Sequence, residues 1–325
     1  MLVHALAILA GSSGIARAQS TPAAKSAPLA PVAIEATKKD ETPSAPTPVR
    51  LVPREVTPDL VWDPRWRRFS TAELIGTGII AAGALPFAVI PSIGHSLDAR
   101  DGFDESARTT LRLGTATARN TARDVSDVLL TVSITYPFFI DALAAAYLKR
   151  KSPDVAAQMV QMDLEALAVN AFASAMVSNL TGRERPYGRL CSADPAKQTF
   201  DCSSTSRYRS FFSGHSSTAF TSAGLVCSHH LHFDLFGGGA KDALACITAL
   251  LAAGTTASLR VMADQHYLSD VLVGSAVGAA MGFGVPWLMH YRGGSLFPGS
   301  DRARPGAVTW TLAPGPLGGT LFGTF

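Results

Sequence analysis

The chain has 325 residues, of which 47% are hydrophobic and only 16% are charged, and its formal net charge at pH 7 is +3. This charged fraction is low for a soluble protein, and the mean hydropathy of +0.20 indicates helices that are buried in a core or in a membrane. The net charge is small and no basic stripe is interleaved with aromatic residues, so we expect no nucleic-acid partner. These properties favour a protein of the cell envelope.

The N-terminal region predicts export rather than a folded domain. Residues 2–10 are a short apolar stretch, and Ala16-Arg17-Ala18 follows as an A-x-A cleavage pattern. We therefore expect a signal peptide over residues 1–18. Residues 19–58 are rich in Ala, Pro, Thr and Lys without an apolar period, which predicts a disordered linker. A helical domain over 59–295 and a C-terminal tail over 296–325 complete the expected organisation.

Cysteine usage agrees with an oxidising compartment. Cys191 and Cys202 bracket a polar loop that is short enough to close as a disulfide. Cys227 and Cys246 fall inside apolar helical segments, and we expect them to be buried thiols. No Cys-x-x-Cys occurs and the histidines of residues 229–232 have no matching ligand pair, so no metal site is expected.

The apolar periodicity after the linker predicts an all-α fold, a six-helix antiparallel bundle. The expected helices cover residues 71–90, 125–148, 154–180, 213–226, 242–259 and 266–289. A further surface helix is expected over 104–118, and the Gly/Pro-rich tail shows an alternation that favours a small hairpin. Gly274, Gly278 and Gly282 recur every four residues, which predicts a smooth helix face that another helix approaches closely.

A histidine and an aspartate stand at the start of the last predicted helix. His266 and Asp270 are four residues apart and share one face, so the carboxylate can accept the imidazole Nδ1–H. This leaves Nε2 with a free lone pair, as a nucleophile or base requires. Arg260 precedes the pair and brings a fork of donors suited to a phosphate. Taken alone, such a pair is also an ordinary capping contact.

Two further polar clusters stand at helix ends. Arg183 and Arg185 close the third helix before Pro186, and Ser213-Gly214-His215 opens the fourth, where backbone N–H groups form an anion site. Alone, the first is an ordinary helix stop and the second an ordinary capping turn. In an antiparallel bundle, however, all three clusters converge at one end. Together they predict a phosphate pocket with a nucleophile and an acid.

In order and spacing, these clusters resemble the three motifs of the type 2 phosphatidic acid phosphatase superfamily, which also contains bacterial class A acid phosphatases and vanadium haloperoxidases. The family pattern is Lys, six residues, Arg-Pro; then Pro-Ser-Gly-His; then Ser-Arg, five residues, His, three residues, Asp. The matching residues are Arg185-Pro186, then Ser213, Gly214 and His215, then Arg260, His266 and Asp270.

The resemblance implies a role for each matching residue. His266 attacks phosphorus to form a phosphohistidine, Asp270 orients its imidazole, and His215 protonates the leaving group and then activates water. The phosphoryl oxygens are held by Arg185, Arg260, Ser213 and the Gly214 backbone. No metal and no cofactor are implied.

The chain also departs from the family pattern. Ser178 stands where the first motif has Lys, and the loss of one donor costs about 3 kcal/mol of transition-state stabilisation. Arg183, at the end of the same helix, is a candidate substitute that could equally face solvent. Phe212 replaces the Pro before Ser-Gly-His, and Leu259 replaces the Ser before the third-motif Arg.

We therefore expect a phosphatase that acts on a phosphomonoester or a lipid (pyro)phosphate, with a phosphorylated lipid or small molecule as substrate and a membrane surface as partner. A vanadate-dependent haloperoxidase and a catalytically weakened envelope protein remain alternatives. The basic clusters 65–68 and 149–151 lie at the end opposite the motifs, so a spanning bundle would place the site outside the cytoplasm. A cleaved signal peptide conflicts with six spanning helices but fits a bundle resting on the membrane. In both cases we expect a periplasm-facing site.

Overall fold

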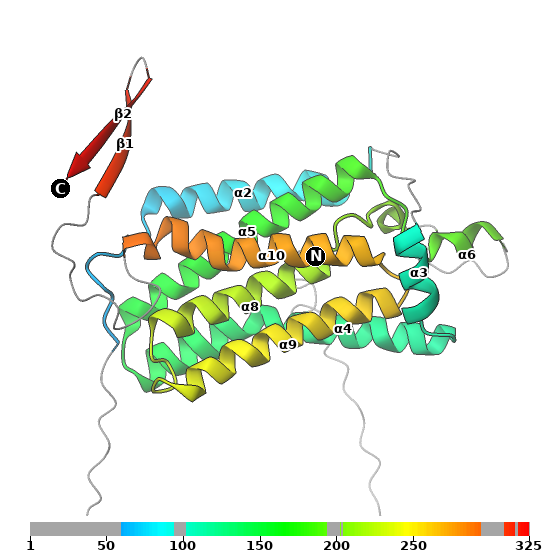
Figure 1. Cartoon of the computed structure of the whole chain (residues 1–325), viewed down its shortest axis with the longest axis horizontal. Coiled ribbons are helices and arrows are strands. Elements are labelled where there is room, and N and C mark those ends of the chain that lie inside the picture. The colour runs from blue at the N-terminus through cyan, green and yellow to red at the C-terminus, as the bar shows by residue number, and fades with distance from the viewer. Residues whose placement is uncertain are drawn as a thin grey trace, which may run out of the picture. The chain divides into compact units, whose positions relative to one another are not determined.

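The computed structural model describes the backbone of residues 60–93, 102–193, 202, 204–293, 309–315 and 318–324. The expected signal peptide and linker lie outside the described residues. Within them, six helical segments of 19 or more residues run along one bundle (Figure 1). These are α2 (Thr71–Val89), α4 (Ala116–Tyr136) with its π-helical continuation η1 (Pro137–Lys149), α5 (Pro153–Thr181), α8 (Gly214–His232), α9 (Ala240–Met262) and α10 (Leu268–Met289).

The remaining elements are short. They are α3 (Gly102–Leu111), α6 (Gly188–Ala193), the 3-10 turns η3 (Thr205–Tyr208) and η4 (Tyr291–Gly293), and the strands β1 (Thr309–Gly315) and β2 (Gly318–Thr324). The two strands pair antiparallel and form the only sheet of the described residues. The all-α class expected for the bundle is confirmed.

One expected helix is divided in the structure. The surface helix expected over 104–118 is two elements, because α3 ends at Leu111 and Thr115 caps a new helix by accepting a hydrogen bond from the Ala118 N–H. The second predicted helix therefore begins at Ala116, well before the apolar run at 125 from which it was inferred. Nor is α3 merely a surface helix, because its Asp104 is fully buried.

Helix α8 is the central helix, with α4, α5, α9 and α10 packed around it. The glycine face of α10 lies directly on α8, as the four-residue spacing predicts. A Cβ atom built at Gly278 would lie 2.8 Å from the carbonyl carbon of Ser217 and closer still to its oxygen. At the same contact, the Thr221 hydroxyl donates to the Gly278 carbonyl at 3.2 Å. This close approach brings the N-terminal ends of α8 and α10 together.

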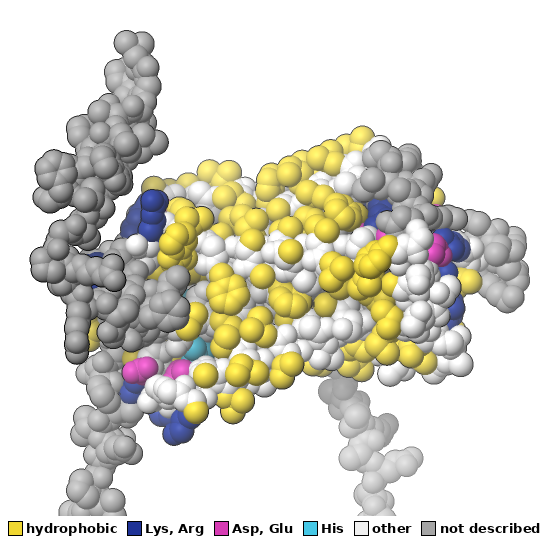
Figure 2. All heavy atoms as spheres, viewed as in Figure 1, with side chains coloured by type: hydrophobic (Ala, Val, Ile, Leu, Met, Phe, Trp, Pro, Cys, Tyr) yellow, Lys and Arg dark blue, Asp and Glu magenta, His cyan; other side chains and the backbone are white. Residues whose placement is uncertain are grey.

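The outer surface of the bundle is apolar. Four helical segments, α2, α4 with η1, α9 and α10, are long and apolar enough to cross a membrane. Figure 2 shows hydrophobic side chains over the middle of the visible face, with charged side chains gathered toward the two ends. Large side chains of these helices point outward; Ile79 of α2 is 67% exposed and Leu251 of α9 is 66% exposed. These surfaces indicate association with a membrane.

The structure corrects the expectation for two cysteines. Cys227 and Cys246 are not free thiols but form a disulfide that joins α8 to α9, with a Cα–Cα distance of 4.5 Å. The reason is the antiparallel packing of these two consecutive helices, which places one residue of each at the same level. Apolar surroundings alone do not distinguish a buried thiol from such a bond.

Candidate active site

His266 lies in the turn between α9 and α10 and is buried. Its Nδ1 lies 2.8 Å from the backbone carbonyl of Ser210, a distance at which Nδ1–H donates to that oxygen. The nearest Asp270 oxygen is 3.8 Å from Nδ1, which is beyond hydrogen-bond distance. His266 Nε2 is buried without a partner among the described residues. The ring thus has the orientation that a nucleophile needs, but a backbone carbonyl provides it in place of the expected carboxylate.

The surroundings of His266 keep its imidazole neutral. Burial, followed by the positive charge of Arg185, lowers the pKa of His266 to about 3. At neutral pH the ring is therefore unprotonated at Nε2, and the lone pair of that nitrogen is available to an electrophile.

Asp270 contacts the histidine indirectly, through Ser210. One of its oxygens accepts from the Ser210 hydroxyl at 2.5 Å and from the Tyr267 N–H at 2.9 Å. Its other oxygen accepts from Arg183 Nη1 at 2.5 Å. Because Ser210 binds Asp270 through its hydroxyl and His266 through its carbonyl, the carboxylate positions the ring indirectly. Sequence spacing cannot reveal this link, since any residue type presents a backbone carbonyl.

Arg183 does not face solvent and does not stand in for the missing lysine. It is buried, and its guanidinium donates to Asp104 at 2.6 Å, to Asp270 at 2.5 Å and to the Ser269 hydroxyl at 2.8 Å. Burial lowers the pKa of Arg183, but the charge of Asp270 and the bonds to both carboxylates outweigh it and raise that pKa. Its side chain therefore belongs to the support of the site rather than to a phosphate-binding surface.

The position of the missing lysine, Ser178, lies in the last turns of α5. Its side chain is buried, and its hydroxyl donates to the Ala175 carbonyl at 3.2 Å within the same helix. A serine at this point supplies no positive charge.

His215 stands in the first turn of α8 and faces α4. Its Nε2 lies 2.7 Å from an oxygen of Asp127, and the same oxygen is 3.0 Å from Arg260 Nη1. Arg260 also donates to the Ser126 hydroxyl at 2.9 Å. One carboxylate thus joins the proposed acid to one of the proposed phosphate ligands. Asp127 was missed as a site residue in the sequence, although an aspartate that interrupts an apolar helix is a signal of function.

His215 is also neutral in the absence of a substrate. Burial, followed by the charge of Arg260, lowers the pKa of His215 to about 4, and the bond to Asp127 opposes this only in part. A phosphate dianion near Arg260 would offset that positive charge and raise the pKa of the ring. The acid form required for protonating a leaving group thus depends on the bound anion.

Arg185 reaches the same region from the end of α5. Its Nη1 donates to the Gln265 side chain at 2.8 Å and its Nε to the Ser206 carbonyl at 2.9 Å. The charge of Arg185 lowers the pKa of both His266 and His215. Gln265, which adjoins the nucleophile candidate in sequence, is a further residue that sequence reasoning missed.

Ser213 and Gly214 form the start of α8. The Ser213 hydroxyl caps the helix by accepting from the Ser216 N–H at 3.3 Å and from the Ser216 hydroxyl at 2.9 Å. The Ser213 N–H donates to the Asp270 carbonyl at 3.0 Å, which ties the start of α8 to the start of α10. Gly214 leaves its backbone unshielded at the positive end of the helix dipole, where an anion binds favourably.

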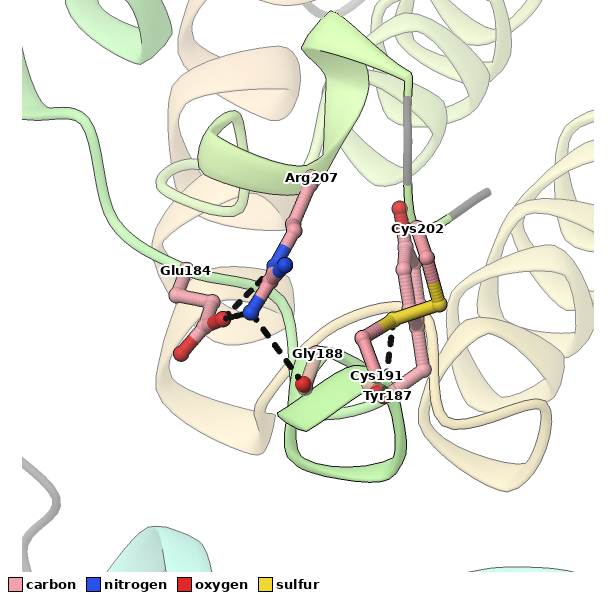
Figure 3. Close-up of a disulfide and its surroundings, with 6 residues drawn as sticks. All are labelled: Glu184, Tyr187, Gly188, Cys191, Cys202 and Arg207. Atoms are coloured by element: carbon pink, nitrogen blue, oxygen red, sulfur yellow. Dashed lines mark hydrogen bonds and ion pairs between the residues drawn. A yellow bond between two sulfur atoms is a disulfide. The ribbon is translucent and has the colours of Figure 1, made fainter. Parts of the chain in front are cut away.

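A disulfide closes the loop beside this end of the bundle (Figure 3). Cys191 and Cys202 are bonded with a Cα–Cα distance of 5.5 Å. Nearby, Arg207 Nε donates to Glu184 at 2.8 Å, and the Arg207 carbonyl accepts from the Arg185 N–H at 2.8 Å. The segment that follows Cys202 is therefore bonded to the segment that carries Arg185.

The structure brings the sequence-predicted residues to one end of the bundle, where Arg183 binds Asp104 and Asp270 and serves as a support. Two arginines, a helix N-terminus and two neutral histidines lie at this end, and such groups together suit the binding of a tetrahedral anion. No group of three or more His, Cys, Asp or Glu side chains in the described part of the chain is arranged to hold a metal ion.

Part of the chain matches a known protein family. Residues 164–294 match the PAP2 superfamily, a range that includes α8, α9, α10 and most of α5. No curated protein and no solved structure matches the chain. The helices α2, α3 and α4 lie outside the family match. Asp104 belongs to α3 and Asp127 to α4.

Proposed function

We propose that this chain, whose residues 164–294 match the PAP2 superfamily, is a phosphatase that hydrolyses a phosphomonoester or a lipid (pyro)phosphate through a phosphohistidine on His266. One observation carries the proposal above all others. His266 Nε2 is buried and unpartnered among the described residues, while Nδ1–H is held by a backbone carbonyl and the ring is kept neutral. A buried polar atom without a partner is costly, and it is expected where a ligand or reacting atom completes the bonding.

The first chemical step transfers the phosphoryl group. The Nε2 lone pair of His266 attacks phosphorus, and the bond from phosphorus to the leaving oxygen breaks. His215 gives its proton to that oxygen as charge develops on it. Arg185, Arg260 and the N–H groups at the start of α8 stabilise the equatorial oxygens.

The second step regenerates the enzyme. Neutral His215 accepts a proton from a water molecule, and the water oxygen attacks phosphorus as the bond to His266 Nε2 breaks. Inorganic phosphate leaves, and His266 returns to its neutral form. Asp127, which is bonded to both His215 and Arg260, keeps the acid and the phosphate ligand in register.

We place the protein in the cell envelope with its site facing the periplasm, after removal of residues 1–18 and with residues 19–58 as a linker. The Cys191–Cys202 disulfide supports this placement, because it lies beside the site and disulfides persist in oxidising compartments. The apolar surface of the bundle favours a lipid phosphate as the substrate.

A second candidate is a catalytically weakened protein of the same fold. It is favoured by Ser178, because no charge replaces the lysine there and Arg183 is occupied by two carboxylates. A vanadate-dependent haloperoxidase is a further alternative, because the groups that would bind phosphate would also bind vanadate.

The test is phosphate release from a panel of lipid and soluble phosphates by the purified full chain in detergent. We expect release by the wild type, loss of at least a factor of about 1000 in His266→Ala, and little change in His290→Ala. His290 is a matched control, since it is also buried but lies just after the opposite end of α10. Hydrolysis that survives His266→Ala would refute the proposal. A folded but inactive wild type would support the weakened protein, and halide oxidation by added hydrogen peroxide only after vanadate addition would support the haloperoxidase.

A further inference from the structure

We propose that Asp104, on α3 and outside the family match, is a positioning residue that sets the orientation of His266 through Arg183, Asp270 and Ser210. The inference rests on the proposed role of His266 as the nucleophile. It assigns a function to α3, the short helix that was expected to be no more than a surface element.

The first link joins α3 to the start of α10. Asp104 is fully buried, and one of its oxygens accepts from the Ser269 N–H at 2.8 Å. The other oxygen accepts from the Ser269 hydroxyl at 2.6 Å and from Arg183 Nη2 at 2.6 Å. The carboxylate therefore caps the first turn of α10 from outside the helix and fixes one side of the guanidinium.

The second link carries the constraint to the reacting ring. The other side of the Arg183 guanidinium binds Asp270 at 2.5 Å, and Asp270 holds the Ser210 hydroxyl at 2.5 Å. The Ser210 carbonyl accepts the His266 Nδ1–H at 2.8 Å. Every residue in this series, from Asp104 to His266, is buried. Each bond is therefore strong and difficult to exchange for water.

Helix α3 is itself fixed against the catalytic turn. Arg108 and Arg112 both bind Asp264, at 2.6 and 2.7 Å, and Asp264 has a left-handed backbone with a φ of 61°. The Leu113 N–H donates to the Met262 carbonyl at 3.0 Å. Asp104 is therefore presented to Arg183 from an element that is anchored to the same turn on which His266 lies.

Replacing Asp104 by Asn should disturb the ring without removing side-chain volume. The amide oxygen can still accept from Ser269, but its NH₂ group meets the donors of Arg183. With only one carboxylate left, the guanidinium is drawn toward Asp270, and the Asp270–Ser210 contact that places the carbonyl shifts. We expect kcat to fall by roughly 10- to 100-fold, with KM changed by less than about 2-fold, because misplacement of the nucleophile affects the chemical step.

Glu105→Gln is the matched control. Glu105 is the next residue of α3 and also forms an ion pair, with Arg189, but it touches no member of the series. Both substitutions remove one negative charge and one arginine pair from the same helix. A purely structural role for Asp104 predicts that Asp104→Asn lowers stability but leaves kcat of the folded enzyme unchanged, whereas the positioning role predicts a fall in kcat for Asp104→Asn and none for Glu105→Gln. Asp104→Glu restores the charge and should recover part of the rate.

The second readout is independent of activity. Nitrogen-15 labelling of histidine reports which ring nitrogen carries the proton, and in the wild type His266 should be protonated at Nδ1 alone. We expect Asp104→Asn, and Ser210→Ala from the other end of the series, to produce a mixture of tautomers. Glu105→Gln should leave the wild-type signal unchanged.

The kcat and the tautomer signal together distinguish a failure of the proposed function from a failure of the positioning role. A wild type that releases no phosphate but shows the tautomer change in Asp104→Asn would refute the proposed function and leave the positioning role intact. Unchanged kcat and unchanged His266 signals in Asp104→Asn would overturn the inference. If Asp104→Asn does not fold, Ser210→Ala and Asp104→Glu decide, and wild-type behaviour of Ser210→Ala in both readouts would overturn it equally.

Discussion

The contact between α8 and α10 is the joint that aligns the two halves of the site. His215 and the phosphate-binding start of α8 belong to one helix, while His266 and Asp270 stand at the start of the other. Gly278 faces Ser217 in the middle of this contact. Substituting Gly278 by Ala should therefore both destabilise the bundle and slow the reaction.

The magnitude follows from the distances. The new Cβ would lie 2.8 Å from the Ser217 carbonyl carbon, whereas carbon atoms in contact are normally about 3.5–4.0 Å apart. The helices must then separate by roughly 1 Å, because backbone atoms on both sides leave no flexible side chain to give way. Overpacking of this kind costs about 1–3 kcal/mol, and a shift of that size between acid and nucleophile costs roughly 100-fold in rate.

Gly284→Ala in the same helix is the control. A Cβ at Gly284 meets nothing within 4 Å, so there the usual preference of helices for Ala over Gly should raise stability by about 0.5–1 kcal/mol. Thermal unfolding in detergent and phosphate release should be measured on both variants. Equal stability and equal rates for Gly278→Ala and Gly284→Ala would refute the view that close backbone contact aligns the site.

Three further outcomes are expected. Ser178→Lys should raise kcat/KM by about 10-fold or more, because Arg183 does not replace the lost donor; an unchanged value would show that another group does. Since the pKa values of His266 and His215, about 3 and about 4, lie below that of an unfolded histidine, the free energy of unfolding should be level above about pH 6.5. It should then fall by roughly 1.4 kcal/mol per pH unit per histidine on acidification, and less steeply in His266→Gln; equal slopes would contradict this. Finally, reduction of the bond from Cys227 to Cys246 should lower stability by about 3 kcal/mol in denaturant titrations, and intact-mass measurement of free thiols in the unreduced chain would contradict that bond.

The sequence predicted which of these residues lie together better than it predicted their contacts. Helix periodicity and three spaced clusters were enough to bring His215, Arg260 and His266 to one end of a bundle. The partner of His266 was wrong, because the expected Asp270 contact is replaced by the backbone carbonyl of Ser210. Ser210 lies in the loop before α8, and no side-chain pattern in the sequence encodes which backbone carbonyl such a loop presents to the histidine.

Long-range pairs explain most of what was missed. Asp104 and Arg183 are separated by 79 positions, and Asp127 and His215 by 88. In the sequence, each of these residues resembles an ordinary surface charge or a polar interruption of a helix, because its partner lies far away along the chain. The same holds at the other end of α8, where His229 is buried against Asp163 at 2.8 Å. Only the tertiary structure distinguishes such pairs from solvated charges.

In the proposed reaction, His266 Nε2 becomes bonded to phosphorus during turnover. The most direct measurement is rapid quenching of the full chain in base during hydrolysis of a phosphate-labelled substrate, followed by peptide mass spectrometry, because phosphohistidine is preserved in base and lost in acid. We expect labelled phosphate on the peptide that contains His266, and none in His266→Ala. Steady hydrolysis by the wild type with no label on that peptide, or with label on His215 instead, would contradict it.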